Sequence, residues 1–578
     1  MAAYKKNIIW IVPFGLVSIS FLFFQFFYPY HLFLKEQIQL FLYTSDYFLS
    51  YFNKPAWLAC YSGDFLTQFF YLRGGGAIVL SILFVIEWTL GLIVIRKITS
   101  SIKESIWALI PVIADWILYC DTLNSISVSV GFILVLMLFL IYATISNRWL
   151  STTTGVIMAF TGYWLAGISF LIFPFLIVAI DLKKGRLSLL KWMVIGGLVF
   201  SIPLAMRHFY LLTIVQTYIF PAFGTQSLLL PGSFIVAITI PFFLKKFEVN
   251  NSLMTRIVLP SILIILLIAG IMGRANFRFE KILSLDSETY FGHPDRVIEL
   301  SQKYNLKDRR ATYFTNMALA KKGILADSLL NYYQPASYGL IIPVTPDENW
   351  QSIFMSSEVF FLIGDMNLAQ HSAMLGNTFS PYQRSSRMIS RLAEINLING
   401  DSAAAGKYLR ILSKTLFHKK WAEKLQAMNN SAVSDSWLTE KRSQIPGEDL
   451  LRKSNNYQVS LNFIVEQNPG NLIALDYLLC FHLLNKDLKS FKKAYDQYGR
   501  KIKRDVPLVY SEALLIQLLT LHATHEEVLS YAIYPQKVKD FSTYTQLYEQ
   551  TKGDMNVLKE RFGKSYWFYY HFATIQQK

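Results

Sequence analysis

The stretch GGAIVLSILFVIEWTLGLIVI, residues 75–95, is followed directly by Arg96 and Lys97. It contains one ionisable residue, Glu87, and it is long enough to cross a bilayer, which takes roughly 20 apolar residues in a helix. Basic residues at one end of such a helix favour the cytoplasmic side of the membrane. The stretch therefore predicts a transmembrane helix whose C-terminal end faces the cytoplasm.

The rest of the N-terminal half has the same character. The chain of 578 residues is 53% hydrophobic with a mean hydropathy of +0.33, which is too apolar for an ordinary soluble protein. Residues 1–272 carry only 17 of the 55 lysines and arginines and 9 of the 39 acidic residues. Because the first apolar run is long for a signal sequence and lacks a small-residue cleavage site, we interpret it as a retained anchor. The apolar runs predict about nine spans, at residues 8–28, 75–95, 105–120, 123–145, 149–163, 165–181, 189–206, 229–244 and 253–272.

The basic residues of this half indicate how the spans are oriented. With the N-terminus in the cytoplasm, the outer side carries four of them, Lys35, Lys54, Arg73 and Arg207. The inner side carries thirteen, namely Lys5, Lys6, Arg96, Lys97, Lys103, Arg148, Lys183, Lys184, Arg186, Lys191, Lys245, Lys246 and Arg256. This distribution follows the positive-inside rule. An odd number of spans then predicts a multi-pass protein of a bacterial inner membrane whose C-terminal half is extracytoplasmic.

Residues 149–180 carry no charge and are few for two full-length spans. Because Arg148 and Lys183 both belong inside, the stretch has to go out and return as two short helices, with a predicted turn at Thr161, Gly162 and Tyr163. Irregular backbone at membrane depth is tolerated only inside protein or beside water. The sequence thus predicts a cavity that opens to the outer side.

The first outer loop, residues 29–74, is too long for a simple turn. One polar face of a predicted helix in it is formed by Lys35, Gln39, Asp46 and Ser50. Such a helix is typical of a segment that lies in the membrane interface. The aromatic segment SGDFLTQFFY, residues 62–71, follows it. We expect the loop to cover the mouth of the cavity.

Residues 273–578 show amphipathic helices separated by short polar junctions. The junctions are Gly292-His293-Pro294, Lys322-Gly323, Gly364-Asp365, Gly400-Asp401 and Lys486-Asp487. The first four are 31, 41 and 36 residues apart, close to the tetratricopeptide period of about 34. We therefore predict an α-solenoid resembling tetratricopeptide repeats, which offers a concave surface to a protein partner or covers the membrane domain. The irregular segment from Tyr338 to Trp350, which contains IPVTPDENW, interrupts the pattern as a linker or a functional loop.

Several chemistries find no support in the sequence. The short basic loops orient helices and do not indicate a nucleic-acid surface. The three cysteines, Cys60, Cys120 and Cys480, form no CxxC or zinc-binding spacing, and they leave open a disulfide between Cys60 and Cys120. No P-loop, GxSxG, HExxH or GxGxxG occurs in a suitable context. ATP-driven transport, serine hydrolysis and zinc proteolysis are therefore not indicated.

Ionisable residues in or beside membrane spans are costly to bury, so each is a functional candidate. On the outer side, Glu36, Asp46 and Asp64 lie in the first loop. Asp46 and Asp64 flank the expected cavity mouth, where a carboxylate could act as a general base on an acceptor hydroxyl or hold a divalent metal ion. Arg207 and His208 could stabilise a phosphate leaving group. The structural alternatives are that Asp46 is an interfacial residue, that Asp64 caps a helix, and that Arg207 anchors to lipid headgroups.

Glu87 and Asp115 are ionisable residues inside predicted spans. Glu87 could face the bundle interior and pair with Asp115 or with a tyrosine hydroxyl, which would suggest a proton or ion path. Such relays usually contain more than two acidic residues, and the sequence shows no inverted internal repeat of the kind found in many transporters.

The layout of residues 1–272 resembles the GT-C class of glycosyltransferases. It has a long first outer loop with acidic residues and an interfacial helix, short paired helices, and an extracytoplasmic domain after the last span. Members of that class use polyprenyl-phosphate-linked sugars as donors and commonly place a catalytic or metal-binding acidic residue in the first outer loop. The resemblance implies this role for Glu36, Asp46 or Asp64. It implies binding of the donor phosphate by Arg73, Arg207 and His208.

The chain is also similar to a group of bacterial polytopic membrane proteins without an assigned activity. The shared elements are FLTQFF at residues 65–70 and the loop residues Glu36, Gln37, Gln39, Leu40 and Phe41.

The leading hypothesis is a membrane glycosyltransferase of GT-C type. It would bind a polyprenyl-phosphate-linked glycan, or another lipid, in the outer cavity, while the repeat domain presents a protein acceptor. The alternatives are a non-enzymatic scaffold whose repeats recruit partners for envelope assembly, and a transporter. Convergence of two loop carboxylates on a groove favours the enzyme, whereas carboxylates scattered to solvent favour the scaffold.

Overall fold

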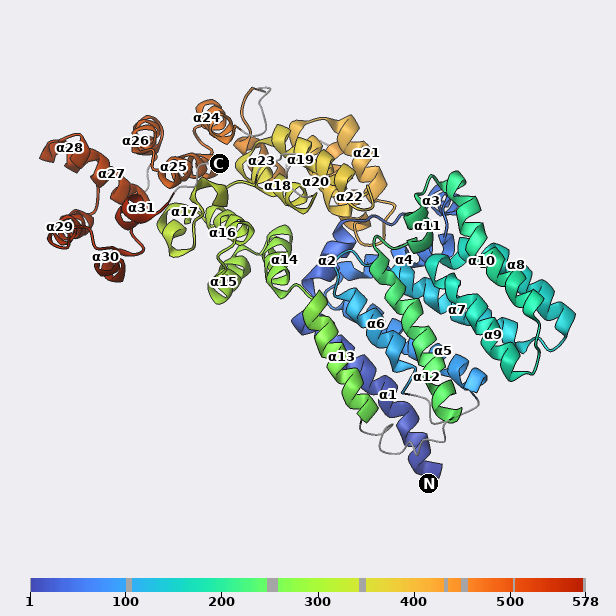
Figure 1. Ribbon diagram of the computed structural model, residues 1–578. Helices are drawn as coiled ribbons and strands as arrows, with labels where there is room; N and C mark the ends of the chain where they lie inside the picture. Colours follow the sequence, from blue (N-terminus) through green and yellow to red (C-terminus); the bar gives the residue numbers. More distant parts are fainter. Residues whose placement is uncertain are drawn as a thin grey trace. The chain divides into compact units, whose positions relative to one another are not determined.

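The computed structural model describes residues 2–99, 106–246, 258–342, 350–430, 435–448, 456–502 and 505–574. The chain is 79% helical and the described residues contain no strand, which confirms the all-α prediction. Two compact units are present (Figure 1). The first consists of Met1–Glu280 and Ser413–Lys419, and the second of Lys281–Leu412 and Lys420–Lys578.

The first unit is a bundle of apolar helices connected by short helical turns. Its helices are α1 (Ala2–Leu22), α2 (Tyr30–Gln37), α3 (Ser45–Ser50), α4 (Trp57–Thr67), α5 (Gly75–Thr99), α6 (Leu109–Tyr119), α7 (Ile126–Thr144), α8 (Arg148–Ala166), α9 (Phe173–Lys183), α10 (Leu189–Tyr210), α11 (Ile214–Ile219), α12 (Leu229–Lys246), α13 (Leu259–Arg274) and the start of α14 (Phe277–Tyr290). A π-helical turn (Phe23–Phe27) extends α1. The 3-10 turns are η2 (Tyr51–Asn53), η3 (Gln68–Tyr71), η4 (Gly167–Ile172) and η5 (Thr225–Leu228).

Several of these helices are long and apolar enough to cross a membrane. Four segments of the described chain meet this condition, Gly75–Thr99, Ile126–Thr144, Arg148–Lys183 and Leu189–Tyr210. Two bent pairs raise the number to six if each is one span; these are Val12–Phe27 with Tyr30–Gln37 (80°) and Leu259–Arg274 with Phe277–Tyr290 (62°). Each of the nine predicted runs corresponds to one helix, but α6 and the apolar part of α12 are shorter than a full span, and α8 and α9 form one apolar segment. Part of the ninth run, residues 253–257, lies outside the described residues.

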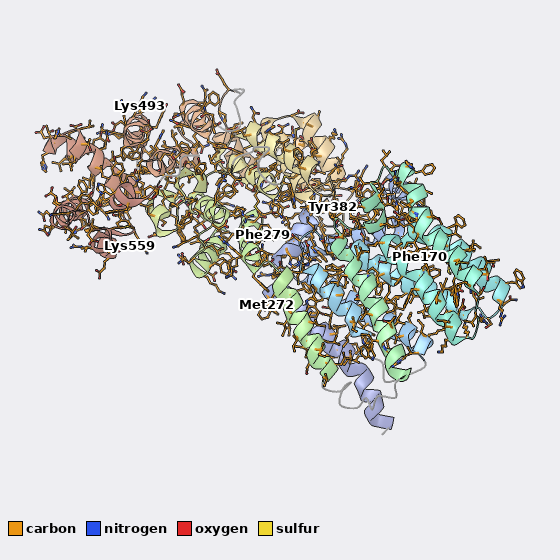
Figure 2. The ribbon with its side chains drawn as sticks, viewed as in Figure 1. Phe170, Met272, Phe279, Tyr382, Lys493 and Lys559 are labelled. Atoms are coloured by element: carbon orange, nitrogen blue, oxygen red, sulfur yellow. The ribbon has the colours of Figure 1, made fainter. Side chains whose placement is uncertain are left out.

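The predicted turn at Thr161, Gly162 and Tyr163 is wrong. Helix α8 continues through these residues to Ala166, and the break comes at Gly167, whose φ of +66° suits a glycine. Gly162 has a packing role instead, because a Cβ there would lie 2.1 Å from the ring of Phe170. Phe170 is fully buried, whereas Met272 on α13 is exposed (Figure 2).

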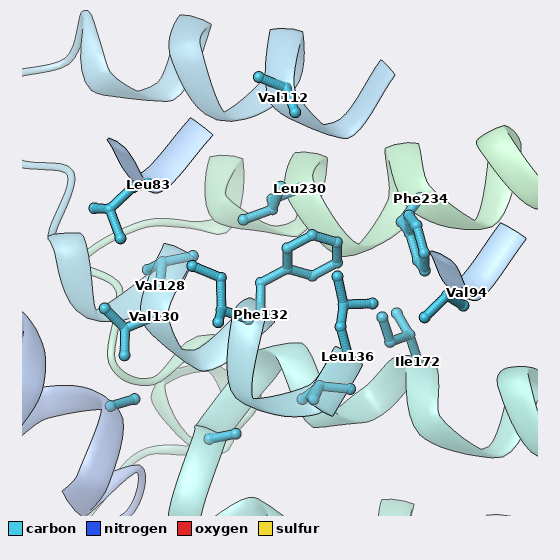
Figure 3. Packing of buried hydrophobic residues seen from close by; sticks show 14 of the residues in the cluster. Leu83, Val94, Val112, Val128, Val130, Phe132, Leu136, Ile172, Leu230 and Phe234 are labelled. Atoms are coloured by element: carbon cyan, nitrogen blue, oxygen red, sulfur yellow. The ribbon is translucent and has the colours of Figure 1, made fainter. Parts of the chain in front are cut away.

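The core of the first unit is formed by aliphatic and aromatic side chains from α5, α6, α7, α12 and the η4 turn. Figure 3 shows the central part, in which Phe132 of α7 packs edge-on against Phe234 of α12 with ring centroids 5.2 Å apart. Around them lie Leu83, Val94, Val112, Val128, Leu136, Ile172 and Leu230. All three cysteines are buried free thiols, so the disulfide between Cys60 and Cys120 is not formed.

The second unit continues α14 and adds short helices that pack mainly against their neighbours in the chain. They are α15 (Pro294–Tyr304), α16 (Arg309–Lys321), α17 (Leu325–Ser328), α18 (Trp350–Ile363), α19 (Met366–Phe379), α20 (Ser386–Asn399), α21 (Ser402–Leu412), α22 (Lys419–Asn430), α23 (Ser436–Gln444), α24 (Tyr457–Gln467), α25 (Leu472–Leu484), α26 (Leu488–Gln497), α27 (Leu508–Thr520), α28 (His525–Leu529), α29 (Pro535–Gln550), α30 (Met555–Phe562) and α31 (Tyr566–Phe572). The predicted irregular segment falls largely at residues 343–349, outside the described chain.

All five predicted junctions are turns between helices. Gly364 and Gly400 end α18 and α20 in the left-handed region, with φ of +87° and +80°. The aspartate after each glycine then caps the next helix, since Asp365 accepts from the amide of Leu368 and Asp401 from that of Ala404. The local chemistry predicted from the sequence therefore produces the helical hairpins of this unit.

Candidate functional site

The loop at residues 29–74 is folded tightly against the bundle. The single polar-faced helix predicted for it is wrong, because α2 ends at Gln37 and a new helix, α3, begins after the N-cap Thr44, which accepts from the amide of Tyr47. The polar face is divided accordingly. Lys35 and Gln39 are buried, and Asp46 and Ser50 are exposed.

Asp64 is the loop carboxylate that other side chains hold in place while it stays partly accessible. It lies on α4, is half-buried, and accepts a hydrogen bond of 2.5 Å from the hydroxyl of Tyr51. The Tyr51 hydroxyl also lies 2.6 Å from that of Tyr47, and Lys54 stands 3.7 Å from the centre of the Tyr51 ring. Burial and the neighbouring Asp64 carboxylate raise the pKa of Tyr51, so this phenol remains a donor to Asp64.

Aromatic rings surround this group. Tyr61, one turn before Asp64 on α4, packs edge-on against Tyr51 and Phe48, at centroid distances of 5.3 and 5.0 Å. Phe65, the next residue after Asp64, packs against Phe41 at 5.6 Å. Aromatic rings therefore surround Asp64, and the hydroxyl of Tyr51 orients one of its carboxylate oxygens.

Glu36 lies in a different environment. It is buried at the end of α2, 3.3 Å from Nε2 of His418. His418 belongs to Ser413–Lys419, which is part of the first unit. In the same segment Phe417 stacks on Tyr71 with centroids 5.6 Å apart, and the amide of Tyr43 donates to the carbonyl of Lys414. The sequence held no signal for this contact, since Glu36 and His418 are separated by 382 residues.

The remaining predicted site residues are more accessible. Asp46 is exposed in the first turn of α3. Arg73 is exposed just before α5, and the last turn of α10 carries Arg207, half-buried, and His208, exposed.

The structure does not assemble these six residues into one cluster. Within the described part of the chain, no side-chain hydrogen bond or ion pair joins Arg73, Arg207 or His208 to the three loop carboxylates. Nor do the described residues contain a group of three histidine, cysteine, aspartate or glutamate side chains that could hold a metal ion. The predicted outer cavity stays a prediction.

A second polar group lies in the interior of the bundle. Glu87 of α5 and Asp115 of α6 are both fully buried, and Asp115 is the charged group that acts on Glu87. The Ser129 hydroxyl of α7 lies 2.7 and 2.9 Å from the two oxygens of Asp115. It also lies 2.8 Å from the hydroxyl of Tyr119. The sequence indicated the two acids, but serine in an apolar run gave no signal.

Next to this group lies a buried histidine. Nε2 of His31 is 3.0 Å from the carbonyl of Tyr119, and Nδ1 is 3.6 Å from Glu280. Glu280 accepts from the backbone amides of Tyr30 and His31, at 2.5 and 3.0 Å. Lys35 donates to the carbonyl of Asn124. Polar groups thus continue from the bundle interior to the loop, and His31 and Glu280 were not anticipated from the sequence.

Residues 3–573 match the family described as "Family of unknown function (DUF6057)". The chain belongs to the DUF6057 family. The match runs through both units of the chain. No curated protein and no solved structure matches the chain. The description of the family assigns no activity to it.

Proposed function

We propose that this DUF6057 protein is a membrane glycosyltransferase of GT-C layout, which transfers a glycan from a polyprenyl-phosphate-linked donor at the outer face of the membrane. Asp64 is the general base. The observation that carries the proposal is the hydrogen bond from the buried Tyr51 to the half-buried Asp64, because it orients a carboxylate at a surface lined by aromatic rings. Positioned groups of this kind are what general-base catalysis requires.

The choice among the three loop carboxylates follows from their environments. Asp46 is exposed, and nothing described holds it in one orientation. Glu36 is buried and lies against His418, so it stabilises the fold of the loop. Asp64 alone combines accessibility with a positioning partner. One positioned carboxylate is weaker support for the transferase hypothesis than two converging carboxylates would be.

The reaction needs few groups from the protein. Asp64 takes the proton of the acceptor hydroxyl as the acceptor oxygen forms a bond to the anomeric carbon of the donor sugar. The bond from that carbon to the phosphate oxygen breaks, and polyprenyl phosphate leaves with the electron pair. The negative charge of the departing phosphate is stabilised by the side chains of Arg73, Arg207 and His208. Tyr51 is a positioning residue.

Two groups of contacts support the proposed sidedness of the bundle. At the C-terminal end of α7, Lys184 donates to the carbonyl of Ala143 and Arg186 to that of Ile145. At the N-terminal end of the same helix, Gly63 of α4 packs so closely that a Cβ would lie 2.4 Å from Oγ of Ser127. Basic residues and the acidic loop therefore lie at opposite ends of α7. With the basic end inside, about nine spans and an extracytoplasmic solenoid remain our proposed topology.

The test uses the full chain purified with its native lipid. Mass spectrometry should find a polyprenyl-phosphate-linked glycan bound to the wild-type protein and to Asp64→Asn, and transfer by Asp64→Asn should fall by about 10²–10⁴-fold. Asp46→Asn is the matched control and should keep its activity. Tyr51→Phe should lower kcat while the KM for donor stays unchanged. Normal transfer by a well-folded Asp64→Asn variant would refute the role of Asp64.

A second function is favoured by the hairpins of the second unit. Paired helices with glycine and aspartate turns are the building units of solenoids that bind protein partners. A scaffold for envelope assembly would need no carboxylate at residue 64. Loss of the whole protein would then alter the envelope, and Asp64→Asn would restore it completely.

A further inference from the structure

The middle of α5 carries a carboxyl group that the proposed transferase does not use. Glu87 is completely buried, and within the described residues its carboxyl oxygens face no hydrogen-bond partner other than the carboxyl group of Asp115. Trp116, adjacent to Asp115 on α6, is 3% exposed and also leaves its indole N–H without an acceptor. Buried polar groups are normally paired, so these orphaned atoms require a reason.

Asp115 is the counterpart of Glu87. It is also fully buried, but the Ser129 hydroxyl reaches both of its oxygens. Helices α1, α6, α7, α9 and α12 pack against α5, and among the described residues Asp115 is the one charged group that acts on Glu87. Lys35 of α2 acts on Asp115, not on Glu87. Among the described residues, the surroundings of Glu87 therefore contain a second acidic group and no cation that acts on it.

Two neighbouring carboxyl groups in an apolar interior cannot both be ionised, because desolvation and mutual repulsion both oppose the second charge. The pair consequently retains one proton. Asp115 is the better carboxylate, since a hydroxyl donor faces it. Glu87 faces no hydroxyl or cationic donor among the described residues, so the proton resides on Glu87 and bridges its carboxyl group to that of Asp115.

We propose that Glu87 and Asp115 form a proton-binding site inside the transmembrane bundle, in which Glu87 holds the proton and Ser129 stabilises Asp115. The ligand is a proton. The hydroxyl groups of Ser129 and Tyr119, which lie 2.8 Å apart, are the polar groups next to Asp115 through which the proton exchanges. This site is independent of Asp64 and of the transferase reaction. Helix packing alone does not explain Glu87, because glutamine or leucine at this position of α5 would pack without burying an acid.

The experiment is infrared spectroscopy of the full chain in lipid nanodiscs at neutral pH. A protonated carboxylic acid has a C=O stretching band well separated from the amide and carboxylate bands. We expect the wild-type protein to show this band, and Glu87→Gln to lose one such group per molecule. Growth with ¹³C-labelled glutamate should shift the band, and growth with ¹³C-labelled aspartate should leave it in place.

Two buried glutamates of the second unit have to be separated from Glu87, whereas the labelling already separates the aspartates. Burial raises the pKa of both Glu394 and Glu512. A Glu394→Gln, Glu512→Gln double variant is therefore the matched control and should retain the Glu87 band. If Glu87→Gln does not fold, Asp115→Asn serves instead, because removing the neighbouring carboxylate should shift the frequency of the same band.

The proposal is overturned if the wild-type protein has no such band. It is equally overturned if the band survives in Glu87→Gln, or if it keeps its frequency in Asp115→Asn. Sodium is the competing occupant. If the band is present in choline buffer and disappears when sodium is added at constant pH, the site binds a metal cation in preference to a proton, and the proposal fails.

Discussion

Replacement of Arg387 by methionine tests how the second unit is held together. Arg387 of α20 is completely buried and makes bonds of 2.8 and 2.9 Å to the two oxygens of Asp286. It also donates to Glu358 of α18 at 2.9 and 3.1 Å. Methionine keeps the aliphatic volume and removes every one of these donors.

The expected loss can be estimated from what remains. Glu358 keeps its 2.6 Å bond from Arg391, but Asp286 loses both bonds from the guanidinium in a site that is 1% exposed. Removing one partner of a buried pair costs about 3–5 kcal/mol, because it leaves a buried charge uncompensated. The opening equilibrium of α18 and α20 should therefore rise by about 10²- to several thousand-fold.

Hydrogen exchange of the full-length protein, read by mass spectrometry in α18 and α20, measures this opening. Arg296→Met is the matched control, because Arg296 makes a 2.6 Å pair with Glu299 on an exposed surface. Exposed pairs contribute about 0–1 kcal/mol. An Arg387→Met, Asp286→Leu double variant should recover much of the loss, since no unpaired carboxylate remains. Equal protection in Arg387→Met and Arg296→Met would refute the reasoning.

The same network predicts a pH dependence. Burial alone would raise the pKa of Glu358, but Arg391 and Arg387 hold it below its ordinary value. A carboxyl group with a lowered pKa in the folded state contributes stability that is present above its unfolded pKa of about 4.3 and is lost as the pH falls below it. Protection of α18 should therefore decrease on acidification from about pH 5. In Glu358→Gln this part of the acid sensitivity should be absent.

Three further changes have defined outcomes. Gly63→Ala should destabilise the first unit by about 1–3 kcal/mol, because its Cβ would lie 2.7 Å from the backbone nitrogen of Ser127, whereas Gly196→Ala, with no atom within 4 Å, should be nearly neutral in thermal unfolding. Gly400→Ala should lower the free energy of unfolding by roughly 1–2 kcal/mol because of the positive φ at this position, since no atom lies within 4 Å of the added Cβ. Unchanged stability in urea unfolding would contradict this prediction. Burial lowers the pKa of Lys441 to about 8, so competitive acylation at that pH should label Lys441 ahead of the exposed Lys424, and equal labelling would argue against it.

The sequence predicted well those features that local chemistry decides. Gly400 followed by Asp401 ends one helix and caps the next without help from distant residues, which is why the junctions were placed correctly. The helix boundary inside the loop had a local signal too, because Thr44 with Asp46 two residues later is typical of an N-terminus. The amphipathic pattern that runs from Lys35 to Asp46 instead favours one continuous helix, so the boundary at Thr44 is not predicted.

Contacts between distant residues could not be predicted in this way. Nothing near Glu36 indicates His418, and Ser129 is one hydroxyl in an otherwise apolar helix. The turn at residues 161–163 failed for a related reason. Gly162 was interpreted as a turn residue, but it is small because the Phe170 ring packs against it, and only the folded chain brings Phe170 there.

Buried acids in both units are paired with cationic side chains, whereas Glu87 is not. In the first unit the ammonium group of Lys191 lies 2.7 Å from the buried Asp181. In the second unit Asp286, Glu358 and Glu394 each face an arginine at 2.6–2.9 Å, so their burial is compensated and fold stability accounts for them. Glu87 of the first unit has a second acid as its neighbour and, among the described residues, no hydrogen-bond partner other than that acid. An apolar side chain would be more stable there. Packing therefore explains the arginine network and leaves Glu87 unexplained, whereas reversible protonation accounts for both acids and for the serine hydroxyl that faces only one of them.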